Sequence, residues 1–286
     1  MKLIAKILAG LFILIYISDI IFTQDNQLNN PYFGMKLLGG NPEIFPEEKF
    51  YYFFNNGTEC YYAEKGIWYS KLEDGKWTEP LNTMIDYGKY ADFEMNISPD
   101  GGKIFFNSIT RQLPPGSKNT ISQIWIAERK EINWTEPANP GFGGMYVTST
   151  FDGTIYYTNV DDAKNGYIVN SKFKNGKYQK EEVIPEPVFD ASQKDLHPCI
   201  APDESYLIFD SETRKMINNC ALFISFRRKD DSWTPPINMG NYIKQEGASL
   251  AKITPDGKLL FYQAQRGIMW WVSTSIIEEL KSNNKK

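Results

Sequence analysis

One short stretch determines the expected architecture of this chain: the turn Ser98-Pro99-Asp100-Gly101, followed by the strand Lys103-Ile104-Phe105-Phe106-Asn107-Ser108. This turn and strand recur three more times at nearly constant intervals. The later turns are Thr150-Phe151-Asp152-Gly153, Ala201-Pro202-Asp203-Glu204 and Thr254-Pro255-Asp256-Gly257, and the successive aspartates are 52, 51 and 53 residues apart. Proline fixes φ, and an Asp-Gly pair tolerates the positive φ of a tight hairpin turn. Each copy therefore predicts a β-hairpin.

A second motif keeps the same spacing and closes each repeat. It reads Trp-Thr-x-Pro at Trp77–Pro80, Trp134–Pro137 and Trp233–Pro236, and Tyr178 takes the tryptophan position in the remaining copy. An apolar strand such as Ile124-Trp125-Ile126-Ala127 precedes it. We therefore expect units of four short antiparallel strands, with the fourth strand beginning at the tryptophan. Four strands in a repeat of about 50 residues are typical of a propeller blade.

A degenerate copy between Phe50 and Trp77 brings the number of repeats to five. The 263 residues after residue 23 hold close to five repeats of about 52 residues, whereas six repeats would need about 312. The sequence therefore favours an all-β chain that forms one five-bladed β-propeller over residues 39–280, with six blades as the alternative. The last repeat lacks a Trp-Thr-x-Pro strand. We expect Gly39–Phe45 to supply its fourth strand and so close the ring.

The repeated turn also resembles a known family. A (Ser/Ala/Thr)-Pro-Asp-Gly turn before an aromatic strand is similar to the PD40, or WD40-like, repeat of the TolB-type propellers, and Asn41-Pro42-Glu43-Ile44-Phe45 resembles the start of exported single-domain members. The resemblance covers residues 39–275. It implies an exported, periplasmic or cell-surface propeller that contacts proteins or glycans. The chain departs from the family in blade number, because TolB-type propellers commonly have six blades.

The N-terminal segment predicts export. Lys2 and Lys6 precede an apolar run at 7–17, which is too short to cross a bilayer and is typical of a signal peptide ending near Thr23; an uncleaved anchor is the alternative. Residues 24–38 are then a linker and residues 281–286 a polar tail. We expect a periplasmic or extracellular protein whose membrane contact is confined to this segment. In that compartment Cys199 and Cys220 either form a disulfide or stay as buried thiols.

Composition excludes several classes of function. The net charge of −4 and the absence of a basic stripe argue against nucleic-acid binding. The chain has one histidine, His197, which excludes multi-histidine zinc sites and any second Ser-His-Asp arrangement. We expect no metal and no cofactor. We also expect a monomer.

A candidate site follows from the strands that enter the Asp-Gly turns, since the innermost strand of each blade lines the channel of a propeller. Residues six and eight before the turn aspartate share a face of the strand. This alternation predicts that polar side chains of two blades meet in the channel, with Tyr146 beside them and Glu246 at the rim. The predicted ligand-binding residues are Asp92, Glu94, Tyr146, Asp195, His197 and Glu246.

Two functions remain open at this stage. The first is a non-catalytic module that binds or scaffolds a protein or a glycan, either at the channel mouth or at the long loops 109–122 and 212–219. The second is a glycan-active hydrolase that uses Asp92, Glu94 and Asp195, because glycoside hydrolysis needs a pair of carboxyl groups about 5 to 10 Å apart. A channel plugged by Tyr146 and Leu250 would argue against the hydrolase. A structural role for the polar channel residues is the third interpretation.

Overall fold

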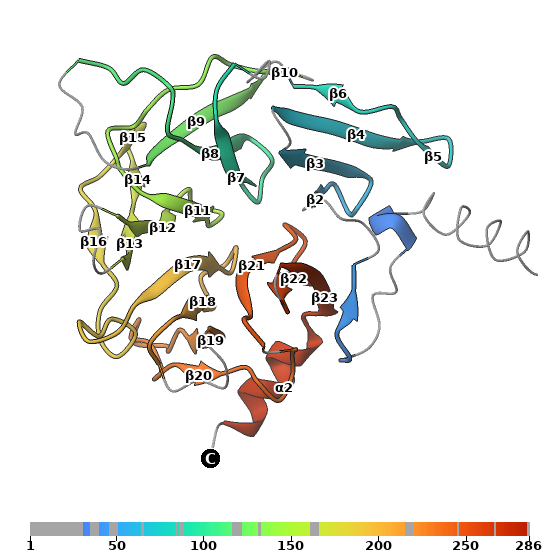
Figure 1. The fold of residues 1–286 in the computed structure, drawn as a ribbon. Coiled ribbons are helices and arrows are strands. Elements are labelled where there is room, and N and C mark those ends of the chain that lie inside the picture. The colour runs from blue at the N-terminus through green and yellow to red at the C-terminus, as the bar shows by residue number, and fades with distance from the viewer. Residues whose placement is uncertain are drawn as a thin grey trace, which may run out of the picture.

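Five antiparallel sheets surround a common axis like the blades of a propeller (Figure 1). The structure is a computed structural model, and it describes residues 31–34, 40–45, 51–63, 66–83, 85, 89–115, 122–130, 133–160, 166–214, 220–244, 246–265 and 267–284. The predicted signal peptide and most of the linker therefore lie outside the described residues, as do parts of the two long loops. The all-β, five-bladed prediction is confirmed.

Each blade is built in chain order from the axis outward. Blade 1 contains β2 (Tyr51–Phe54), β3 (Glu59–Ala63), β4 (Ile67–Glu73), β5 (Lys76–Trp77) and β6 (Leu81–Asn82). Blade 2 contains β7 (Asp92–Ile97), β8 (Lys103–Ser108), β9 (Gln123–Lys130) and β10 (Asn133–Trp134). Blade 3 contains β11 (Met145–Ser149), β12 (Ile155–Asn159), β13 (Tyr167–Ser171) and β16 (Glu182–Val183), with the small hairpin β14 (Phe173–Lys174) and β15 (Lys177–Tyr178). Blade 4 contains β17 (Asp195–Ile200), β18 (Tyr206–Ser211), β19 (Ala221–Phe226) and β20 (Ile237–Asn238).

Blade 5 joins the two ends of the propeller. Its inner strands are β21 (Ser249–Ile253), β22 (Leu259–Ala264) and β23 (Ile268–Ser273), and its outer strand is β1 (Glu43–Ile44). In β1, Glu43 lies opposite Trp271 and Ile44 opposite Trp270. The predicted closure by an N-terminal strand is confirmed, because β1 occupies the place that a Trp-Thr-x-Pro strand takes in other blades.

The Trp-Thr-x-Pro motif does not start the outer strand directly. Trp77 and Trp134 pair with the far end of the third strand, and the outer strand resumes only after the proline, at β6 and at Ala138. Proline has no N–H to donate, so the ladder breaks there. The threonine repairs the break: the hydroxyl of Thr135 accepts the backbone N–H of Glu128 at 3.0 Å, as those of Thr78 and Thr234 do for their own third strands.

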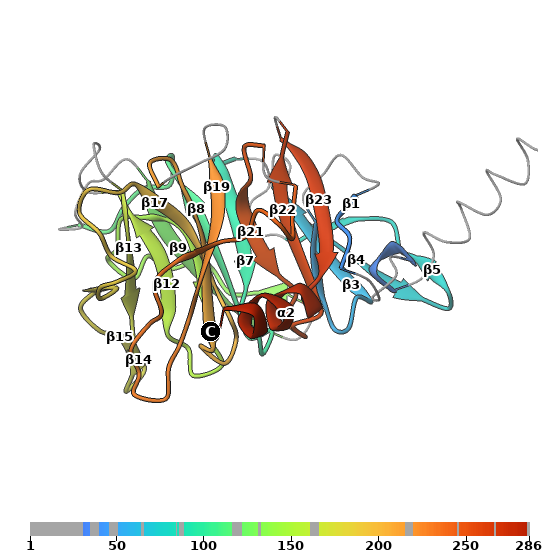
Figure 2. The ribbon, with the colours of Figure 1, turned by 90° about the horizontal axis from the view of Figure 1, so that it is seen from below.

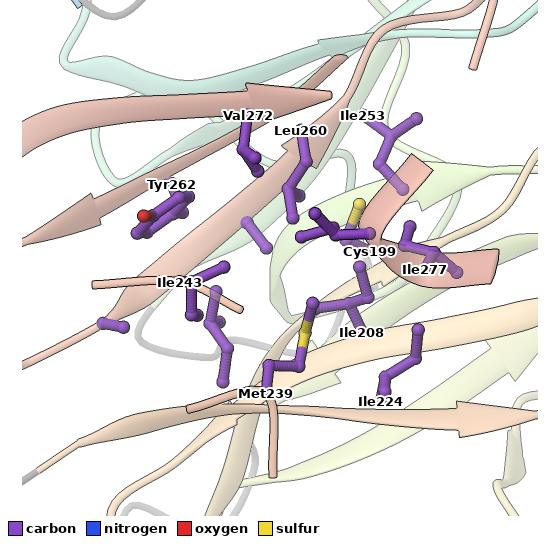
Figure 3. Close-up of a cluster of buried hydrophobic side chains, with 14 of the residues drawn as sticks. Cys199, Ile208, Ile224, Met239, Ile243, Ile253, Leu260, Tyr262, Val272 and Ile277 are labelled. Carbon is purple, nitrogen blue, oxygen red and sulfur yellow. The ribbon is translucent and has the colours of Figure 1, made fainter. Parts of the chain in front are cut away.

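The disk has two distinct faces. We call the face with the four repeated turns the turn face, and the opposite one, where the second and third strands connect, the loop face. Helix α2 (Ser275–Asn283) follows β23 and lies near the lower edge of the disk in Figure 2. The repeat pattern of the sequence does not predict this helix. Its buried Ile276, Ile277 and Leu280 pack into the core between blades 4 and 5, which Figure 3 shows around Ile208 and Leu260.

Candidate functional site

Every clear repeat carries a β-bulge at the same place in its innermost strand. The pairing with the second strand shifts between Phe93 and Asn96, and at the equivalent place in the three later blades. The bulged residues adopt left-handed backbone angles: φ is 51° at Glu94, 57° at Tyr146, 50° at His197 and 55° at Leu250. A bulge interrupts the alternation of a strand and re-aims its side chains. Residues six and eight before the turn aspartate therefore do not lie in one regular row.

Three of the four left-handed residues are held by the preceding blade. Asn107 Oδ1 accepts the N–H of Tyr146 at 3.1 Å, Thr158 Oγ1 that of His197 at 2.9 Å, and Asp210 Oδ1 that of Leu250 at 3.2 Å. All three acceptors stand at one position of the second strand. Because a buried N–H needs a partner, this position is polar in these three blades. The contacts join neighbouring blades around the axis.

Two predicted site residues are each held by an arginine. Asp92 in blade 2 receives Nε and Nη2 of Arg111, and Asp195 in blade 4 receives the same two atoms of Arg214, with a shortest N–O distance of 2.6 Å in both pairs. Each Nη2 also donates to the carbonyl oxygen of a residue that precedes the strand. The Asp92 side chain is 1% exposed and that of Asp195 8%. Both carboxylates are therefore neutralised inside their own blades.

Glu94 and His197 form the polar group at the mouth of the channel. His197 Nδ1 lies 2.9 Å from Oδ1 and 3.0 Å from Oδ2 of Asp210, so the other ring nitrogen is left for a different partner. A carboxylate oxygen of Glu94 accepts the N–H of Tyr146 at 3.1 Å. Both side chains keep part of their surface exposed, and each influences the pKa of the other through its charge.

Burial and charge act in opposite directions on these two groups. Burial raises the pKa of Glu94 above its ordinary value, although the positive charges of His197 and Lys252 oppose that change. Burial alone would lower the pKa of His197, but the charge of Asp210 and its hydrogen bond outweigh it, and the pKa is raised. At the mouth, Glu94 therefore keeps its proton to a higher pH than an ordinary glutamate, and the charged form of His197 is favoured over its neutral form.

Tyr146 and Lys252 close the channel below this group. The Tyr146 hydroxyl reaches across from blade 3 and donates to the carbonyl oxygen of Ala251 in blade 5 at 2.9 Å. Lys252 Nζ donates to the Met95 carbonyl oxygen in blade 2 at 2.6 Å and lies about 5 Å from the ring centres of Tyr52 and Tyr146. A cavity of about 20 Å³ lies beneath them, toward the turn face. Its size fits one water molecule.

The remaining predicted residues lie apart from the mouth group. Glu246 is exposed in the turn before β21, where its carbonyl oxygen accepts the N–H of Gln265. The three cysteines are free, so Cys199 and Cys220 form no disulfide, and Cys220 Sγ lies 3.8 Å from Asp210. Among the described residues no cluster of histidine, cysteine and acidic side chains is suited to hold a metal. No helix in that part of the chain is long and apolar enough to span a membrane.

Sequence reasoning missed four residues that shape this site. Asp210 stands seven residues after Asp203, as Asn107 does after Asp100, and Arg111 and Arg214 each follow their aspartate by 19 residues. An alignment of the repeats on their turn aspartates would have revealed Asp210, Arg111 and Arg214. Lys252 lies four before its turn aspartate, at the position of Asn96, Thr148 and Cys199 in the other repeats. A charged residue at a position that is neutral in the other repeats was the one sign in the sequence that Lys252 has a special role.

Comparison with known proteins supports the fold and leaves the activity open. No family model and no curated protein matches this chain. Two similar solved structures are the α-L-arabinofuranosidase of Lactobacillus brevis (15% identity, 80% of this chain and 92% of that chain, TM-score 0.52) and an endo-arabinase of Bacteroides thetaiotaomicron (12%, 79% and 93%, 0.52). A putative TolB from Agrobacterium tumefaciens is also similar (13%, 79% and 89%, 0.39). The propeller fold is shared with glycoside hydrolases; the PD40 resemblance stays a prediction.

Proposed function

We propose that this chain is an exported, non-catalytic β-propeller that binds the hydroxyl-bearing end of a glycan at the mouth of its channel. The observation that supports this proposal most is the state of the acidic residues. Hydrolysis of a glycoside needs two carboxyl groups on opposite sides of the bond. Arg111 and Arg214 neutralise Asp92 and Asp195, which leaves Glu94 as the partly exposed carboxyl group among the predicted inner-strand acids.

The mouth offers the polar groups that a sugar hydroxyl requires. Glu94 supplies acceptor oxygens, and the free ring nitrogen of His197 supplies a donor when the imidazole is charged. Tyr146 contacts the His197 ring edge to face, with ring centres 5.1 Å apart, and closes the floor. A channel mouth that Tyr146 and Lys252 close from below suits the end of a chain better than its middle. A few oriented polar groups are what sites for small ligands commonly use.

Export and a monomeric state belong to the same proposal. They are supported by the sequence at residues 1–23 and by the closure of the ring, since β1 covers the edge that blade 5 would otherwise present to another chain. A protein ligand at the loop face is the alternative to a glycan, and the binding experiment described next would point to it if no glycan binds.

Glycan-array binding followed by calorimetry tests the proposal. Glu94→Gln keeps the shape of the side chain and removes its charge, so affinity for an array ligand is expected to fall by about tenfold, whereas Glu182→Gln on the outer strand of blade 3 should leave it unchanged. Absence of glycan binding by the full chain, or equal affinity of Glu94→Gln and the parent, refutes the site.

A hydrolase is the second candidate, and one observation favours it. Burial raises the pKa of Glu94, which is the change that a general acid needs, and Asp210 is a second carboxylate near it. The test is release of 4-nitrophenol from aryl arabinosides and xylosides. We expect no turnover above the buffer. Turnover that Glu94→Gln abolishes and Glu182→Gln retains would establish the hydrolase instead.

A further inference from the structure

A second pocket lies on the turn face, at the opposite end of the disk from the channel mouth. The turns of blades 3, 4 and 5 and the first turn of α2 surround a volume of about 370 Å³. This is within the range of sites for small ligands and single side chains. Its apolar lining includes Phe151, Pro202, Tyr206, Pro255 and Ile277.

Phe151 is the feature that packing does not explain. It takes the place that proline holds in the other three turns, and it is 63% exposed. Its backbone is nevertheless fixed, because the N–H of Phe151 donates to the carbonyl oxygen of Pro202 at 2.8 Å. A large aromatic side chain held at the rim of a pocket provides a contact surface that costs little entropy to use.

The charges of the pocket have one sign. Its ionisable lining, apart from Tyr206, consists of Asp203, Asp256 and Glu278, and none of the lining residues is basic. Lys258 offsets Asp256 at 3.0 Å. Within the described residues Asp203 and Glu278 form no ion pair, and both are exposed. They approach the pocket from different walls, one from the turn of blade 4 and the other from α2.

Tyr206 lines the same pocket as these two carboxylates. Burial raises its pKa, and the negative charges of Asp203 and Glu278 add to that rise. No hydrogen bond to the Tyr206 hydroxyl occurs among the described residues. The first turn of α2 attracts anions through its dipole, but Glu278 already stands there and offsets that attraction. The pocket therefore favours cations over anions.

We infer that this pocket binds the basic side chain of a partner peptide, an arginine or lysine flanked by apolar residues. The aliphatic stem fits against Phe151 and Pro202, and the charged group lies between Asp203 and Glu278 beside the Tyr206 ring. Carboxylates and an aromatic ring together select a cation with an apolar stem over a neutral sugar. The site is separate from the proposed glycan site and does not depend on it.

Fluorescence anisotropy of a labelled hexapeptide that alternates leucine and arginine tests the inference on the full chain. We expect saturable binding that weakens as salt is raised from 50 to 300 mM, because the contact is electrostatic and exposed. The double variant Asp203→Asn with Glu278→Gln should bind about fivefold more weakly, and Phe151→Ser should weaken binding to a similar degree. Glu279→Gln, an exposed neighbour on α2 outside the pocket, is the matched control.

Three results would overturn the inference. They are absence of saturable binding below about 1 mM peptide, affinity of the double variant within twofold of the parent, and equal or tighter binding of the corresponding leucine and glutamate peptide. Glu94→Gln should leave the anisotropy curve unchanged. A failure here is thus distinguishable from a failure of the glycan proposal.

Discussion

Lys252 is expected to make the stability of this protein rise with pH. Its ammonium group is buried at the axis, where it donates to the Met95 carbonyl oxygen, and burial lowers the pKa of Lys252 from 10.5 to about 8. In the unfolded chain the same lysine keeps its ordinary pKa. Replacing Lys252 with methionine removes the titrating group and keeps a flexible apolar side chain of similar length.

The sign follows from proton binding in the two states. Between pH 8 and 10.5 the unfolded chain holds the proton on Lys252 and the folded chain releases it, so the free energy of unfolding rises with pH. The difference in pKa corresponds to about 3 kcal/mol of penalty at neutral pH. Raising the pH from 7 to 10 relieves about 2.5 kcal/mol of it.

Urea denaturation at pH 7, 8, 9 and 10, followed by tryptophan fluorescence, measures this change. The free energy of unfolding of the parent relative to Lys252→Met should rise by about 2.5 kcal/mol over the range, because groups common to both proteins cancel. Lys174→Met, at an exposed lysine of β14, should run parallel to the parent. Parallel curves for Lys252→Met, or a difference that falls with pH, would refute the reasoning.

Two further predictions concern the mouth and the turns. The charge of Asp210 and its hydrogen bond outweigh burial and hold the pKa of His197 above 6.5, so the contact stabilises the fold fully below pH 6.5 and is lost as the pH rises through the raised pKa. Asp210→Asn should lower the pKa of His197, which NMR can follow because the chain has a single histidine. An unchanged histidine titration in Asp210→Asn would contradict the pairing. Gly101 and Gly257 both have φ of 71°, but a Cβ on Gly101 would meet Phe54 whereas one on Gly257 meets open space. Gly257→Ala should therefore lower the free energy of unfolding by about 1 kcal/mol, and Gly101→Ala should lower it by more, as measured by thermal melting. Equal losses would show that the Phe54 ring moves aside and would contradict the prediction.

The blades could be predicted because the same turn residues and the same apolar strand pattern recur in the sequence at a nearly constant interval. The closure by β1 followed from one missing strand. The bulges left no such mark: Glu94, Tyr146, His197 and Leu250 share no residue type, and none is glycine, although all four are left-handed. An uninterrupted alternation was therefore assumed, and it grouped Asp92 with Glu94 and Asp195 with His197. In the structure the two aspartates instead pair with arginines in the loop that follows the second strand of the same blade.

The bulge also explains where function can vary in this propeller. Residues four before the turn are committed to the ring: Asn96 Nδ2 donates to the Val147 carbonyl oxygen in the next blade, Thr148 Oγ1 to that of Pro198, and Lys252 crosses the axis to Met95. At the bulged position two residues earlier, the preceding blade accepts the backbone N–H of Tyr146, His197 and Leu250. At Glu94 and His197 the side chain lies at the mouth, whereas the Tyr146 hydroxyl crosses the axis to the Ala251 carbonyl oxygen and helps to hold the ring. Charge and shape at this position can therefore change, as from a carboxyl group to an imidazole, in those blades whose side chain does not cross the axis.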